Sequence, residues 1–264
     1  LERYQALSND WPSYDLLHSL YDGNGFARRG YATSGAFVTW LLEKKNKVLE
    51  EIDGIEKQVC LPGGYYHAGQ VCVSVQRLYL HRSIADQFID IYKPMVESLI
   101  VGDPTLPETG VGPLIRPREV ERVKSWVDAA VAEGAEIVTG GEVLEDNCFQ
   151  PTLLKNVQEG MDVVDKEVFG PVVSVIVYDD IEEAVAGANA GPNGFQAAVF
   201  TQDINTGLHA AKKLDFSAVM LNDSTAFRVD WMPFGGRHSS GLGMGGVKYS
   251  IEEMTQLKLI VLNL

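Results

Sequence analysis

The run Val172–Tyr178 (VVSVIVY) decides the fold predicted from this sequence. Its β-branched residues, without an alternating polar face, are typical of a strand that is buried on both sides. Downstream, strands and helices alternate, with helices expected over 180–190 and 203–214 and strands over 195–200 and 218–222. Such a β-α-β-α-β order implies parallel strands joined by right-handed crossovers. The sequence therefore predicts an α/β fold with a parallel sheet flanked by helices in three layers.

Upstream of this run, short apolar segments again alternate with amphipathic ones. Strands are expected over 71–80, 137–139 and 150–157, and helices over 84–99 and 117–134. The strand over 172–178 should lie in the middle of the sheet and be almost wholly buried.

Four residues predict where these upstream helices begin, bend and end. Ser83 is a suitable N-cap for the first helix, and Pro94 inside it predicts a kink or a break. Pro117 suits the first turn of the second helix, and Gly134 suits its C-terminal end.

Composition excludes several classes of partner. The 264 residues carry a formal net charge of −14, which argues against nucleic acid and anionic membrane surfaces. No apolar run reaches membrane-spanning length. The three cysteines, Cys60, Cys72 and Cys148, are an odd number without metal-ligand spacing. We therefore expect reduced thiols, a cytoplasmic location and no metal site.

The stretch Tyr66–Ser74 (YHAGQVCVS) is the strongest candidate for chemistry. Gly69 allows a close backbone approach just before Cys72, and the expected strand over 71–80 places the thiol at a sheet end. Such a placement suits a nucleophile. The alternative is that Cys72 is a small buried hydrophobic residue.

Four separated motifs support the nucleophile. They are GQVC at 69–72, KEVFGP at 166–171, LND at 221–223, and PFGG with SSGLG at 233–236 and 239–243. In order and spacing they resemble the catalytic half of the NAD(P)-dependent aldehyde dehydrogenase family. The resemblance covers about residues 64–264.

The resemblance implies a role for four residues. Cys72 would attack an aldehyde carbonyl to form a thiohemiacetal, with its own backbone N–H helping to hold the oxyanion. Glu167 would bind the ribose hydroxyls of NAD or NADP, and Phe169 would pack beside the nicotinamide. Phe234 would line the aldehyde pocket. Without the resemblance, Glu167 would be read as a surface charge and the two phenylalanines as packing residues.

The chain also departs from the family pattern. The family normally carries a cofactor-binding domain before this half, and residues 1–63 are too few to form one. The Glu-Leu-Gly-Gly segment that supplies the general base is absent, as is the Pro-Trp-Asn segment that supplies the second oxyanion donor. The segment 11–13 is no substitute, and Glu50 or Glu51 is only a guess as a replacement base. The chain is thus expected to be a catalytic-domain fragment, a split subunit or a degenerate homologue.

The sequence thus predicts three regions, and it allows one expected function and two alternatives. Residues 1–62 are expected to be an irregular or helical segment, with an amphipathic helix over 41–59 that the LPGG segment at 61–64 ends. Residues 63–256 would be the catalytic domain, and 257–264 a strand that joins a homodimer or homotetramer. The expected activity is oxidation of an aldehyde to an acid. The alternatives are a non-catalytic homologue acting in assembly and a cofactor-independent thiol esterase.

Overall fold

A four-stranded sheet forms the centre of the structure, a computed structural model that describes residues 59–263. Its strands β1 (Arg77–His81), β2 (Glu136–Thr139), β3 (Thr152–Lys155) and β4 (Val172–Tyr178) lie in the order β1-β4-β3-β2. The strand β4 pairs in parallel with both neighbours, and β2 joins antiparallel at the edge. The predicted interior position of β4 is confirmed, and only its C-terminal end is exposed, at Val177.

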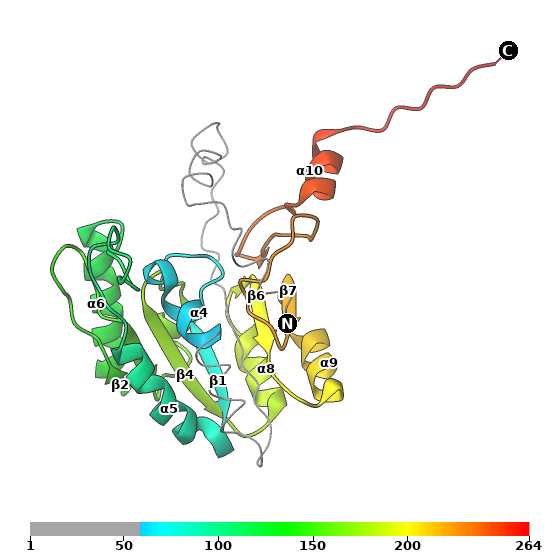
Figure 1. The fold of residues 1–264 in the computed structure, drawn as a ribbon. Coiled ribbons are helices and arrows are strands. Elements are labelled where there is room, and N and C mark those ends of the chain that lie inside the picture. Colours follow the sequence, from blue (N-terminus) through cyan, green and yellow to red (C-terminus); the bar gives the residue numbers. More distant parts are fainter. Residues whose placement is uncertain (1–58, 264) are drawn as a thin grey trace. The chain divides into compact units, whose positions relative to one another are not determined.

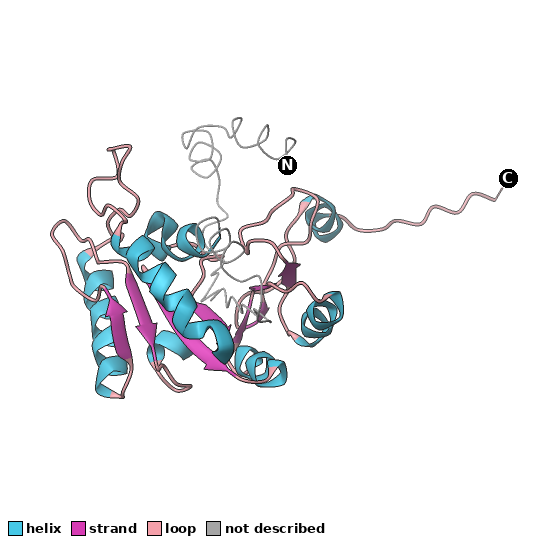
Figure 2. Ribbon diagram, turned by 60° about the horizontal axis from the view of Figure 1, so that its bottom comes forward, coloured by secondary structure: helices cyan, strands magenta, loops and turns pink. Residues whose placement is uncertain are grey.

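Helices cover both faces of this sheet (Figure 2). On one face, a Cβ on Gly64 of α4 (Leu61–Tyr65) would lie 2.6 Å from Val173 of β4, and α5 (Arg82–Glu97) packs beside α4. On the opposite face, Ser174 Oγ donates to the carbonyl of Val163 in α7 (Asp162–Asp165).

Two further helices lie on the face of α7. Arg77 of β1 lies opposite Ser174 of β4 in the ladder, and its guanidinium donates to the carbonyl of Ala188 in α8 (Ile181–Asn189) at 3.0 Å. The helix α6 (Pro117–Ala132) packs against α7. The predicted three-layer α/β class is confirmed.

Two smaller ladders complete the fold (Figure 1). The strands β6 (Gln196–Val199) and β7 (Ala218–Leu221) pair in parallel and are joined by α9 (Ile204–Lys213), as the sequence predicts. They form a ladder separate from the four-stranded sheet. The short strands β5 (Asn193–Gly194) and β8 (Arg237–His238) pair antiparallel, and α10 (Val247–Met254) follows them.

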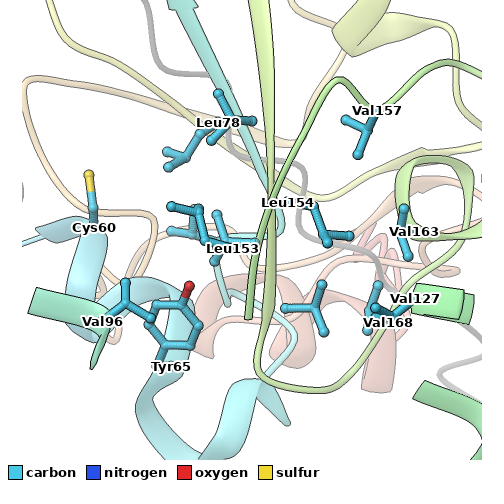
Figure 3. Close-up of a cluster of buried hydrophobic side chains, with 14 of the residues drawn as sticks. Cys60, Tyr65, Leu78, Val96, Val127, Leu153, Leu154, Val157, Val163 and Val168 are labelled. Atoms are coloured by element: carbon cyan, nitrogen blue, oxygen red, sulfur yellow. The ribbon is translucent and has the colours of Figure 1, made fainter. Parts of the chain in front are cut away.

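The core lies on both sides of the sheet because adjacent strand residues point in opposite directions. Figure 3 shows this on β3, where Leu153 points toward Tyr65 and Val96 while Leu154 points toward Val163. Both leucines are fully buried. Each such side chain contributes roughly 1.5–3 kcal/mol to folding, so the two helical layers are held on the sheet from opposite faces.

The predicted strand over 71–80 is shortened at its start. The backbone instead turns at Val71–Ser74, where Ser74 N donates to Val71 O at 2.9 Å, and β1 begins only at Arg77. Val75 N donates to Gly63 O at 2.8 Å, so this segment bonds to α4 rather than to a ladder.

Two predictions about helix boundaries are wrong. The LPGG segment starts the short helix α4, with Pro62 in its first turn, so a domain boundary at residue 62 would cut this helix. The N-cap of α5 is His81, whose ring Nδ1 accepts from Ser83 N at 3.2 Å.

The break that was one of the two outcomes predicted at Pro94 does not occur, because α5 continues through Pro94 into its last turn. The predicted boundaries of α6 are close to those observed. The helix α6 begins at Pro117, and Gly134 follows its C-cap with φ of 109°.

The C-terminal tail is not part of any ladder among the described residues. Residues 255–263 are extended, and the apolar side chains between Leu257 and Leu262 are exposed (Figure 1). The predicted helix over 41–59 lies almost entirely outside the described residues. Within 59–263, no helix is long and apolar enough to cross a membrane.

Candidate active site

Cys72 lies in the turn between α4 and β1 and is half-buried, whereas Cys60 and Cys148 are buried. Three successive residues before it, His67, Ala68 and Gly69, have φ between 50° and 69°. This left-handed backbone is costly for residues with a Cβ and is often found where a site must be positioned. It curls the chain back before the thiol.

A close backbone contact brings the cysteine loop to the loop that carries Glu167. A Cβ on Gly69 would lie 2.1 Å from the carbonyl oxygen of Gly170 and 2.5 Å from its carbon. No other amino acid fits there without movement of one backbone. Two motifs almost a hundred residues apart in the sequence thus meet at this point.

Gln70 anchors the cysteine loop on another side. Its Oε1 accepts from Ile115 N at 2.9 Å, and its Nε2 donates to Pro113 O at 3.3 Å. These bonds attach the loop to the segment before α6. The glutamine of the GQVC motif is therefore a structural clamp in this protein.

The surroundings of the thiol oppose ionisation. Burial raises the pKa of Cys72, and the nearby carboxylate of Glu167 raises it further. The backbone N–H groups of Cys72 and Val73 and the guanidinium of Arg228 lower this pKa but do not reverse the shift. Two N–H groups beside the sulfur are also the type of donor that an oxyanion needs.

The loop carrying Glu167 is held by the side chain of Gln76. Its Nε2 donates to Lys166 O at 2.6 Å and to Val163 O at 3.1 Å, and its Oε1 accepts from Val168 N at 3.0 Å. Gln76 itself is buried. The residues on both sides of Glu167 are thus fixed from the end of the cysteine loop.

Arg122 of α6 supports the same loop from the other side. It donates to Val168 O at 2.7 Å, pairs with Glu119 at 2.9 Å, and stacks on the ring of Trp126. This arrangement places one cation near Glu167, where it lowers the pKa of that carboxyl. Burial outweighs this effect and raises the pKa of Glu167 to about 7.

Phe169 follows Glu167 with φ of 45° and an exposed ring. A small pocket beside it is lined by Glu167, Phe169, Gly69 and Gly170, among other residues. A half-buried carboxyl and an exposed aromatic ring thus lie at one place, and both are groups that can contact a ribose and a flat ring.

Phe234 lies on a different side of the cysteine loop. It packs edge-on against Phe195, with ring centroids 5.1 Å apart, and exchanges two backbone bonds with Gly245. The guanidinium of Arg228 covers its ring at 4.0 Å from the centroid. Phe234 is thus both a packing residue and the support of a charged group that acts on Cys72.

The loop after β7 is attached directly to the cysteine turn. The buried Thr225 donates from Oγ1 to Val73 O at 2.8 Å. Asn222 at the start of the loop binds Thr201 N and O through its amide, which joins the ends of β6 and β7. The LND motif therefore has a structural role here, and Thr225 brings its loop to the site.

Sequence reasoning missed Gln76, Thr225 and Arg228. Gln76 had a visible signal, because it is a polar side chain within an otherwise apolar run. Thr225 and Arg228 had none, since they follow a motif in a loop without periodicity. The residues considered as replacements for the missing base and donor, Glu50, Glu51 and segment 11–13, lie outside the described residues.

Comparison with known proteins identifies the family of this chain. The model of the aldehyde dehydrogenase family matches residues 45–260. Two curated relatives are a 3-sulfolactaldehyde dehydrogenase from Priestia aryabhattai, 46% identical over 201 residues, and a lactaldehyde dehydrogenase from Methanocaldococcus jannaschii, 40% identical over 220 residues. These alignments cover 76% and 83% of this chain but only 42% and 47% of the relatives.

Solved structures give the same result. A glyceraldehyde-3-phosphate dehydrogenase from M. jannaschii, complexed with NADP, matches with a TM-score of 0.78 and 37% identity. The match covers 85% of this chain and 47% of that one. A betaine aldehyde dehydrogenase from Staphylococcus aureus, complexed with NAD+, matches with a TM-score of 0.76 and 31% identity, covering 84% of this chain and 44% of that one. The chain spans less than half the length of these relatives, and it belongs to the aldehyde dehydrogenase family.

Proposed function

We propose that this chain carries the catalytic half of an NAD(P)-dependent aldehyde dehydrogenase, in which Cys72 attacks the aldehyde. The observation that carries the proposal is the meeting of the Cys72 and Glu167 loops through Gly69 and Gly170. Cys72 is also the most accessible of the three thiols among the described residues.

Cys72 would act once its proton has left, because the thiolate is the attacking form. Its sulfur bonds to the aldehyde carbon, and the carbonyl oxygen becomes an oxyanion. The backbone N–H groups of Cys72 and Val73, which lower the pKa of the thiol, are suitable donors to that oxygen. Since burial and Glu167 raise the pKa of the thiol, the resting chain holds Cys72 mainly protonated at neutral pH.

The side chains of Glu167 and Phe169 suit one end of a nicotinamide cofactor, whereas the pocket between them, of about 10 Å³, has room for only about one water molecule. The carboxyl of Glu167 suits two ribose hydroxyls, and the exposed ring of Phe169 suits the face of a nicotinamide. A nicotinamide bound there supplies a hydride acceptor. Because only this end is provided within residues 59–263, we expect the isolated chain to bind NAD or NADP poorly, and micromolar affinity by calorimetry would contradict this.

Two other candidates remain from the sequence. A thiol esterase needs only Cys72 and an acyl ester, and the half-buried Cys72 would serve it in the same way. An assembly role is supported by α10, which has no buried residue and exposes Val247, Ile251 and Met254 on one stripe before the exposed tail. We propose that this stripe and residues 257–264 bind a second copy in a dimer or tetramer, whether or not the chain is catalytic.

Acylation with 4-nitrophenyl acetate tests the nucleophile without any cofactor. We expect a burst of one equivalent of nitrophenolate and an acetyl group on the Cys72 peptide by mass spectrometry. Cys72→Ser should abolish the burst, and Cys148→Ser is the matched control. Acetylation of Cys60 or Cys148 instead would contradict the proposal. Two rates separate the esterase from the dehydrogenase: the rate at which the bound acyl group is hydrolysed, and the rate at which NAD(P)H forms from aldehydes.

We also propose that the substrate is a small aldehyde and that the protein lies in the cytoplasm.

A further inference from the structure

The relatives' names do not select a substrate, but one charged side chain of this chain does. Arg228 lies in the loop after β7, three residues beyond Thr225. Thr225 is bonded to Val73, the residue that follows the nucleophile, so the loop carrying Arg228 is attached at the reacting centre.

The guanidinium of Arg228 is positioned but not paired. Its central carbon lies over the ring of Phe234, 4.0 Å from the centroid, a cation–π contact that does not use the N–H donors. Other arginines of the described chain pair with carboxylates, as Arg82 does with Asp179 and Arg237 with Asp215. No such ion pair is formed by Arg228 within residues 59–263.

An unpaired arginine is notable in a chain with a net charge of −14. The charged groups that act on the Cys72 sulfur are Glu167 and Arg228. Burial keeps Glu167 protonated in part of the molecules near neutral pH, which weakens its repulsion of an anion.

We propose that Arg228 is the anion-binding residue of the aldehyde site, and that the substrate is an aldehyde carrying a negatively charged oxyanion group such as a carboxylate. Phe234 presents the guanidinium, whose paired N–H groups match two oxygens of one such group. The inference rests on the proposed function, since it assumes that Cys72 is the attacking atom.

The geometry also allows a plainer role, in which Arg228 only covers the ring of Phe234. The two roles differ in their effect on a charged reagent that approaches Cys72. Covering the ring would affect neutral and anionic reagents equally, whereas anion binding favours the anionic reagent and weakens as salt screens the charge.

Alkylation of Cys72 in the full chain separates these roles without any cofactor. The rate at Cys72 is measured by peptide mass spectrometry with anionic iodoacetate and with neutral iodoacetamide, and the ratio of the two rates is compared between variants. Because both reagents attack the same thiolate, a change in the pKa of Cys72 cancels in this ratio. We expect Arg228→Gln to lower the ratio about fivefold at low salt and Arg228→Lys to retain most of it.

Arg82→Gln removes another exposed arginine, far along the chain, and should leave the ratio unchanged. High salt should lower the ratio of the wild-type chain toward that of Arg228→Gln. An unchanged ratio in Arg228→Gln would overturn the inference while leaving Cys72 as the nucleophile. Failure of Cys72 to react with iodoacetamide ahead of Cys60 and Cys148 would instead overturn the proposed function.

Discussion

Replacing Gly69 with alanine tests the contact that joins the two site loops. The new Cβ would lie 2.1 Å from the carbonyl oxygen of Gly170 and 2.5 Å from its carbon, both backbone atoms that no rotamer can move aside. The chain must therefore shift at one of the two loops. At φ of 69° the alanine also adopts the left-handed region.

The two costs can be added. A left-handed alanine costs about 1 kcal/mol, and overpacking a well-filled site costs about 1–3 kcal/mol more. We expect Gly69→Ala to lower the free energy of unfolding by about 3 kcal/mol in urea denaturation followed by circular dichroism.

Gly134→Ala is the matched control, because Gly134 has φ of 109° and no atom lies within 4 Å of its added Cβ. It isolates the backbone cost, about 1–2 kcal/mol. The reasoning is refuted if the two variants lose the same stability, since the contact with Gly170 would then contribute nothing. Gly69→Ala should also increase the exposure of Cys72, which faster iodoacetamide labelling would report.

Three further predictions concern the clamp, the carboxyl and the tail. Gln76→Leu removes three hydrogen bonds and leaves the carbonyl of Lys166 and the N–H of Val168 without this partner. It should cost about 3 kcal/mol, whereas the exposed Gln158→Leu should be nearly neutral in the same denaturation assay. The raised pKa of Glu167 means that its contribution to stability is present below the usual value of 4.5 and lost as pH rises through about 7. The free energy of unfolding of Glu167→Gln, relative to that of the wild type, should therefore be about 2 kcal/mol higher at pH 8 than at pH 5, after allowance for the exposed part of the side chain. An equal pH dependence of both chains would contradict this. Deleting 257–264 should convert a dimer or tetramer to smaller species on light-scattering chromatography, and a monomeric intact chain would exclude this role of the tail.

The sequence by itself determined the layers of the fold. The apolar run over 172–178 can be stable only when both faces are covered, so its interior position and the helices around it follow from burial alone. Local signals also held where one residue decides the geometry, as Pro117 does at the start of α6. The motif spacing identified the family and named Cys72 and Glu167 as candidates.

Only the tertiary structure decided how the site is held and charged. The expected strand at Cys72 became a turn because Val75 bonds to Gly63 of α4, a partner that no local pattern reveals. The pKa shifts of Cys72 and Glu167 arise from burial by segments distant in sequence. Arg228 reaches the site because Thr225 bonds to Val73 across 152 positions. Periodicity records which residues are buried, whereas these contacts depend on which loops meet, and that is settled only when the sheet is assembled.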